Sequence, residues 1–153
     1  MNDRKVYERA LGFMVFVGVL SLGCITDTPD AEVSVTGQVR GEAFTGLGGV
    51  AEGASGRYFL TLTDSAEFDC FNTPTGDYLT VVLGQVDGEG EYPAPGNVSF
   101  TSSTDSFGDT EEAVSGTVTV DVVDLDAGSI SGRIDASGSN SSVSGEFLVP
   151  ICD

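Results

Sequence analysis

The fold is decided by residues 114–147, VSGTVTVDVVDLDAGSISGRIDASGSNSSVSGEF. Apolar and polar side chains alternate here in short runs rich in Val, Thr and Ile, and Gly, Ser, Asn and Asp separate the runs. Such alternation is typical of half-buried β-strands, and the separating residues are typical of turns. The stretch therefore predicts a meander of consecutive β-strands.

A short pattern recurs in this stretch and once before it: an apolar residue, Ser or Thr, Gly, any residue, and a second apolar residue. The copies are Val35-Thr36-Gly37-Gln38-Val39, Val114-Ser115-Gly116-Thr117-Val118, Ile130-Ser131-Gly132-Arg133-Ile134 and Val143-Ser144-Gly145-Glu146-Phe147. A period of two places each glycine on the apolar face, so we expect interior glycines that leave room for bulky neighbours. The neighbours we expect include Phe44, Phe59, Phe68, Phe100 and Phe107. The alternative is a glycine backbone exposed for a ligand.

Alternation continues through the rest of the chain from residue 32, and no segment has a sustained apolar period of 3.6 residues. We expect strands at residues 32–44, 57–63, 78–86, 97–102, 113–123, 129–136 and 143–151. Residues 66–72 are either a short strand or a loop, and the glycine-rich residues 46–56 are expected to be a mobile connection. The predicted fold is all-β, an antiparallel β-sandwich or barrel-like meander of about 7–8 strands.

The first 24 residues have the layout of an export signal. A start with Arg4, Lys5 and Arg9 precedes the apolar residues 10–23, and Cys24 follows at once. This layout is typical of a secretory signal peptide, and the run is shorter than the roughly 20 residues that a membrane-spanning helix needs. The alternative is an ordinary cleaved signal in which Cys24 has no role, but no Ala-x-Ala site lies nearby.

The stretch Leu20-Ser21-Leu22-Gly23-Cys24 resembles the lipobox of bacterial lipoproteins. In that family a small residue, here Gly23, precedes a cysteine that is acylated and becomes the new N-terminus. Ser21 stands where a leucine is usual in the family. The resemblance implies three segments: a signal peptide over 1–23, a lipidated N-terminus and tether over 24–31, and a single all-β domain over 32–153.

The same resemblance implies an address. An acylated Cys24 would hold the exported domain on the cell membrane or the outer membrane, and Ile25 in place of an aspartate slightly favours the outer membrane. Residues 116–147 also resemble the C-terminal half of β-domains found in bacterial lipoproteins, which have no established activity. These resemblances imply a fold and a location, with no reaction.

The three cysteines support this interpretation. Lipidation of Cys24 leaves Cys70 and Cys152, an even pair in an exported chain, and we expect these two to form a disulfide. Such a bond would close a loop of about 82 residues, stabilise the domain by roughly 4 kcal/mol and hold the C-terminus in place. Residues 66–72, if a loop, would be held by it. The alternative is two buried free thiols.

Charge excludes several functions. The chain has 24 acidic residues, six basic residues and no histidine, for a net charge of −18. Beyond the predicted cleavage point, three arginines stand against 22 carboxylates, with no lysine. This balance argues against nucleic-acid partners and against electrostatic docking on anionic lipid. The absence of histidine excludes Ser-His-Asp triads, Cys-His pairs and His-ligated zinc, and the absence of lysine beyond the predicted cleavage point excludes a Schiff-base lysine there. The acidity fits either a salty environment or an ordinary acidic surface.

Three acidic loops are the candidate sites for calcium, which takes six to eight oxygen ligands. The loops contain Asp87, Glu89 and Glu91; Asp105, Asp109, Glu111 and Glu112; and Asp121, Asp124 and Asp126. None has EF-hand spacing, and solvated turns are the favoured interpretation because Asp and Gly are ordinary turn residues. A glycan face would have to use Tyr58, Tyr78 and Tyr92, because the chain has no Trp.

These observations predict a lipid-anchored envelope protein with a non-enzymatic structural or binding domain. The expected partner is a membrane, through the N-terminal lipid, and no catalytic residue or cofactor is assigned. The first alternative is a calcium- or carbohydrate-binding module that uses the acidic loops. The second is a hydrolase that relies on carboxylates alone, as in glycoside hydrolysis.

Overall fold

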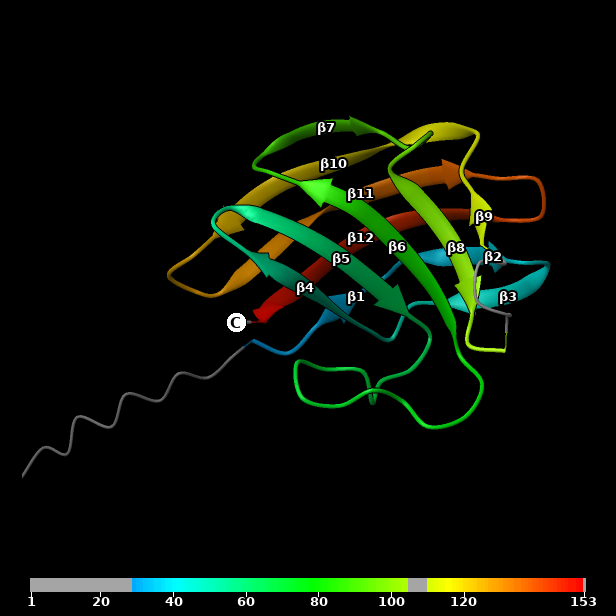
Figure 1. Ribbon diagram of the computed structural model, residues 1–153, viewed down its shortest axis with the longest axis horizontal. Helices are drawn as coiled ribbons and strands as arrows, with labels where there is room; N and C mark the ends of the chain where they lie inside the picture. Colours follow the sequence, from blue (N-terminus) through cyan, green and yellow to red (C-terminus); the bar gives the residue numbers. More distant parts are fainter. Residues whose placement is uncertain (1–28, 105–109, 153) are drawn as a thin grey trace, which may run out of the picture.

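The computed structural model describes residues 29–104 and 110–152, and this part of the chain forms twelve β-strands and no helix (Figure 1). The predicted signal peptide, Cys24, Asp105, Phe107 and Asp109 lie outside the described residues. Within the described residues, no helix has the length and apolar character that crossing a membrane requires. The all-β prediction is confirmed.

The strands are short at the N-terminus and long at the C-terminus. They are β1 (Glu32–Val33), β2 (Thr36–Val39), β3 (Glu42–Thr45), β4 (Gly48–Ala54), β5 (Arg57–Thr63), β6 (Leu79–Val86), β7 (Gly90–Pro93), β8 (Val98–Ser102), β9 (Glu111–Glu112), β10 (Ser115–Asp124), β11 (Ser129–Ser137) and β12 (Ser142–Cys152). The predicted strands from residue 57 onward all occur, with small shifts at their ends. Residues 66–72 form a loop.

The twelve strands form one curled sheet, in which nine follow one another in the order β7-β10-β11-β12-β4-β5-β6-β8-β9 (Figure 1). The other three are joined to this path through β12, with which β1 and β2 pair, and β3 pairs with β2. Neighbours are antiparallel except β12 and β4, which run parallel over two pairs, Ile151 with Ala51 and Cys152 with Glu52. This short parallel pairing joins the two halves of the sheet. β12 is central, because β11 pairs with one side of it while β2, β1 and β4 follow one another along the other.

The curled sheet encloses one apolar core. Alternate side chains of each long strand point into it, as the period of two requires. Among its largest fully buried side chains are Phe44, Phe100, Leu60, Leu62, Leu83 and Ile130. Phe44 and Phe100 therefore have the interior positions predicted for them. Phe59 does not, because it lies on the outer face of β5 and is 53% exposed, and Phe68 is only half-buried.

The repeated glycines follow the prediction in part. Gly132 is buried and faces Phe147 across the β11–β12 ladder. A Cβ at Gly132 would lie 2.1 Å from the backbone carbonyl oxygen of Thr119 on β10 and 2.9 Å from Cζ of the Phe147 ring. Gly37 and Gly116, however, are exposed. Each has a φ in the left-handed region, +148° and +114°, and a Cβ there would collide with backbone of the adjacent strand. Close strand approach explains these two glycines better than core packing does.

Two hairpins occur where the sequence predicted a single long strand and a mobile connection. Residues 32–44 are broken by a tight turn at Arg40 and Gly41, whose φ values of 55° and 86° match a type I′ turn between β2 and β3. Residues 46–56 are not a mobile connection, since β4 occupies most of them and pairs with β5 through a similar turn at Ser55 and Gly56. β7 and β9 were also not predicted.

Candidate functional site

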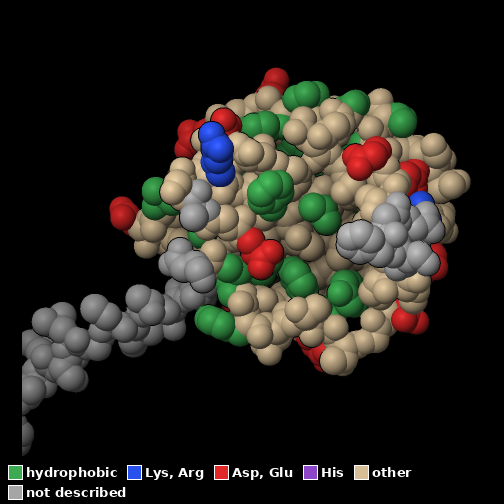
Figure 2. Space-filling view, viewed as in Figure 1, with side chains coloured by type: hydrophobic (Ala, Val, Ile, Leu, Met, Phe, Trp, Pro, Cys, Tyr) green, Lys and Arg blue, Asp and Glu red, His purple; other side chains and the backbone are tan. Residues whose placement is uncertain are grey.

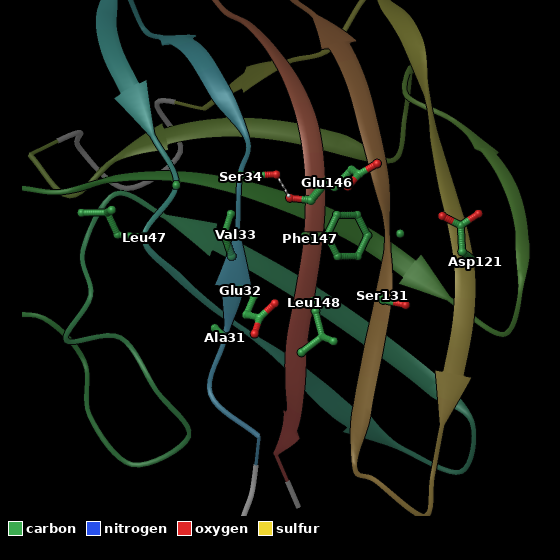
Figure 3. A pocket seen from close by; sticks show the side chains of 12 residues that line it. Ala31, Glu32, Val33, Ser34, Leu47, Asp121, Ser131, Glu146, Phe147 and Leu148 are labelled. Carbon is green, nitrogen blue, oxygen red and sulfur yellow. Dashed lines mark hydrogen bonds between the residues drawn. The ribbon is translucent and has the colours of Figure 1, made fainter.

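An open groove with a volume of about 640 Å³ lies on the outer face of β1, β12, β11 and β10 (Figure 3). We call it the outer groove. Its lining contains the carboxylates Glu32, Asp121 and Glu146, the hydroxyls of Ser34 and Ser131, and the apolar Leu47 and Leu148. Such a lining offers hydrogen-bond acceptors on an acidic surface.

The carboxylates of the outer groove lie on three different strands. Asp121 is the extra residue in a bulge of β10, and Glu146 is on β12, with β11 between them. Figure 3 shows Asp121 at one end of the groove and Glu32 on β1 toward the other. Asp121 also accepts a hydrogen bond from Nη2 of Arg133 at 3.3 Å. In residues 29–104 and 110–152, no three such side chains are placed to hold a metal ion.

Two of the candidate calcium residues, Asp87 and Asp124, make local hydrogen bonds. Oδ1 of Asp124 accepts backbone hydrogen bonds from Asp126 at 3.0 Å and Ala127 at 2.8 Å, which builds the β10–β11 turn. The hydroxyl of Tyr92 lies 3.0 Å from Oδ1 of Asp87 and 2.8 Å from the carbonyl oxygen of Gly88. These contacts match the solvated-turn interpretation. Glu89 and Glu91 are exposed on the same loop and on β7.

Glu111, from the second acidic loop, is a buried structural residue. Its carboxylate accepts hydrogen bonds from the Asn140 backbone at 2.5 Å and the Ser141 hydroxyl at 2.6 Å, so it fastens β9 to the β11–β12 hairpin. Burial would raise the pKa of Glu111, but the hydrogen bonds from Ser141, Asn140 and Ser139 and the charge of Arg40 outweigh burial and lower it. The ionised form is therefore the one that stabilises the fold.

The substitution Glu111→Gln is expected to lower the free energy of unfolding at pH 7 by about 1–3 kcal/mol, because it removes a charged acceptor from two hydrogen bonds. The folded pKa lies below the ordinary value of 4.5. The stabilisation is therefore complete above about pH 4.5 and is lost as the pH falls through the folded pKa. Denaturant unfolding at several pH values measures this, with the exposed neighbour Glu112→Gln as control. An equal effect of both variants at pH 7 would contradict this role.

The three tyrosines do not form a shared glycan platform. Tyr58 is buried in the core at 6% exposure. Tyr92 is half-buried with its hydroxyl bound to Gly88, and burial raises the pKa of Tyr92. Tyr78 is half-buried directly before β6 and donates its backbone N–H to the Ser103 hydroxyl. The three side chains therefore serve separate parts of the fold.

A second hollow lies beside a disulfide. Cys70 and Cys152 are bonded, with Cα atoms 5.3 Å apart and a sequence separation of 82, which confirms the predicted pair. The adjoining groove has a volume of about 340 Å³, and we call it the disulfide groove. Its lining residues are Pro29, Asp30, Ala31, Leu47, Gly48, Gly49, Ala66, Phe68, Asp69, Cys70, Phe71 and Pro150.

Phe71 is the most exposed large apolar side chain of the described residues, at 90%. Oδ1 of Asp69 accepts backbone hydrogen bonds from Phe71 at 2.7 Å and Asn72 at 2.9 Å, and these bonds fix the turn. The backbone hydrogen bond from Phe71 and the side-chain bond from Asn72 lower the pKa of Asp69. An Asp-x-x-Asn turn with an apolar residue inside it is the signal that could have pointed to this exposed side chain.

No family model matches this chain. No curated protein and no solved structure matches it at a significant level either.

Proposed function

We propose that this chain is a lipid-anchored protein of the bacterial cell envelope, whose all-β domain has a structural or binding role without catalysis. The observation that carries the proposal is the N-terminal layout: a basic start, an apolar run over residues 10–23, and Cys24 directly after it. Acylation of Cys24 would fix the chain to a membrane, since two or more acyl chains anchor stably.

The structure supports a domain held close to its anchor. The described chain begins at Pro29, and β1 follows at Glu32. Four residues lie between Cys24 and Pro29, and the five Cα-to-Cα steps from one to the other span at most about 18 Å. The disulfide between Cys70 and Cys152 suits an exported chain, because oxidising compartments are where such bonds persist.

The arrangement of the carboxylates supports a role without catalysis. A hydrolase that relies on carboxylates needs two of them facing one substrate bond. Here Asp121 is paired with Arg133, Asp124 builds a turn, and Glu111 is buried in a structural contact. On the face seen in Figure 2, the acidic side chains are scattered rather than gathered in one hollow.

Fractionation of a bacterial host that produces the full chain tests the proposal. We expect the chain to sediment with membranes, to stay there in molar salt and at alkaline pH, and to be released by detergent. Salt release would indicate electrostatic attachment instead, which screening weakens. A chain found in the soluble fraction without detergent would contradict the proposal.

A further inference from the structure

We infer that the end of the domain that carries the disulfide groove contacts the interfacial region of the bilayer, with Phe71 and Leu47 inserted among neutral lipid headgroups. This inference rests on the proposed function, because it assumes that the chain is held at a membrane. It adds an orientation to it: one named surface faces the lipid and the opposite end of the sheet faces away.

The disulfide groove carries large apolar side chains that are exposed to solvent. Phe71 is 90% exposed and Leu47 is 54% exposed, and both line the disulfide groove together with Ala66, Phe68 and Pro150. Adjacent apolar side chains that point into water have no stabilising partner there, and such patches usually mark a contact surface. Aromatic and leucine side chains are the ones that interfacial segments bury at the level of the lipid headgroups.

The fold holds the Phe71 side chain outward through a disulfide on one side and a hydrogen-bonded turn on the other. Cys70 is bonded to Cys152 at the end of β12, so the residue before Phe71 is fixed to the sheet. On its other side, Nδ2 of Asn72 donates to both carboxylate oxygens of Asp69, at 2.9 and 2.8 Å. A cross-link and a hydrogen-bonded turn thus present this ring to solvent. A side chain left exposed only by a loose loop would lack such supports.

The N-terminal segment that precedes the domain enters it beside the disulfide groove. Pro29, Asp30 and Ala31 line the same groove, so the 28 residues before Pro29, with their apolar run, join the domain at this rim. The β10–β11 turn is at the same end, because Ser129 pairs with Pro150, two residues before Cys152. That turn adds the exposed Leu125, at 69%. An anchor at Cys24 therefore brings these apolar side chains toward the lipid.

The negative charge of the disulfide groove favours neutral over anionic lipid headgroups. The lining of the disulfide groove contains Asp30 and Asp69 but no lysine or arginine. Anionic headgroups would be repelled by this surface, whereas zwitterionic headgroups would not. We therefore name a neutral phospholipid interface as the partner, with binding that depends on apolar contact and little on salt.

Tryptophan fluorescence tests the contact, because the chain has no Trp of its own. The full lipidated chain is reconstituted into phosphatidylcholine vesicles as Phe71→Trp, Leu47→Trp or the control Val114→Trp. Val114 is 65% exposed and directly precedes β10, so ten strand residues, about 33 Å, separate it from the β10–β11 turn. Lipids brominated on their acyl chains serve as quenchers that act only near the bilayer.

We expect a blue shift and a loss of emission by bromolipid for Phe71→Trp and Leu47→Trp, and neither for Val114→Trp. A chain that is attached to vesicles but shows an unshifted, unquenched Trp at position 71 overturns the contact and leaves the anchoring intact. A chain that does not attach to vesicles overturns the anchoring and the contact together. Equal quenching at positions 71 and 114 also contradicts the inference, because it means that no single end faces the lipid.

Discussion

Replacing both Cys70 and Cys152 with serine is expected to lower the free energy of unfolding by about 4 kcal/mol. The bond closes a loop of 82 residues, and a loop of that length loses much conformational entropy in the unfolded chain. Cys152 also lies in the two-pair parallel contact with β4 that joins the halves of the sheet. Loss of the bond therefore removes a constraint from the unfolded chain and weakens this junction in the folded one.

Thermal unfolding measures this effect. A loss of about 4 kcal/mol corresponds to a fall in melting temperature of roughly 15 °C for a domain of this size. Reductant should lower the melting temperature of the unsubstituted chain by a similar amount and leave the double-serine variant unchanged. Two free sulfhydryls in the folded, unsubstituted chain, or equal melting with and without reductant, would show that the bond does not stabilise the domain.

Substituting Cys24 with serine is expected to release the chain from the membrane almost completely. Serine offers no thiol to acylate, and the acidic domain has no basic patch that would replace the lipid by electrostatic attraction. One or two exposed apolar residues such as Phe71 bind weakly compared with two acyl chains. The chain should then be recovered in soluble exported material.

Palmitate labelling and fractionation of paired strains measure this release. The unsubstituted chain should be labelled and sediment with membranes, and Cys24→Ser should lose both properties. The matched control is the double substitution of Cys70 and Cys152, which removes the other two cysteines and should stay labelled. Labelling that survives Cys24→Ser would refute acylation at this position.

Much of the fold follows from period-two alternation. Apolar and polar residues alternate through most of the C-terminal half, so the strands that became β10, β11 and β12 were predicted close to their observed bounds. β4 was missed because Gly48 and Gly49 occupy positions where a side chain normally marks the pattern. Both are buried, and a Cβ at Gly49 would lie 2.9 Å from Cγ1 of Val149. Neighbouring strands lie so close to this position that only glycine fits, and the local sequence does not show this contact.

The two hairpin turns were missed for a different reason. Type I′ turns favour Asn-Gly or Asp-Gly, which accept positive φ easily. Here Arg40 and Ser55 hold the first turn positions, at φ values of 55° and 59°. Contacts from distant residues support one of them: the Arg40 backbone N–H donates to the Ser141 hydroxyl at 2.9 Å. Such support becomes visible only when the chain has folded.

The candidate surfaces were predictable only in part. Counting cysteines gave the disulfide, because an even pair in an exported chain is normally bonded. The disulfide groove could not be predicted, since residues 29–31, 47–49, 66–71 and 150 meet there from four separate segments. The acidic loops drew attention through composition, but hydrogen bonds within the fold decide that Glu111 is buried and Asp124 builds a turn.

The mass of the intact protein purified from membranes tests most directly whether Cys24 is the lipidated N-terminus of the mature chain. We expect the mass of residues 24–153 with the Cys70–Cys152 disulfide formed, increased by the mass of the acyl groups, with all added lipid in the N-terminal fragment. The mass of the whole 153-residue chain, or of a chain cleaved elsewhere and carrying no lipid, would contradict it.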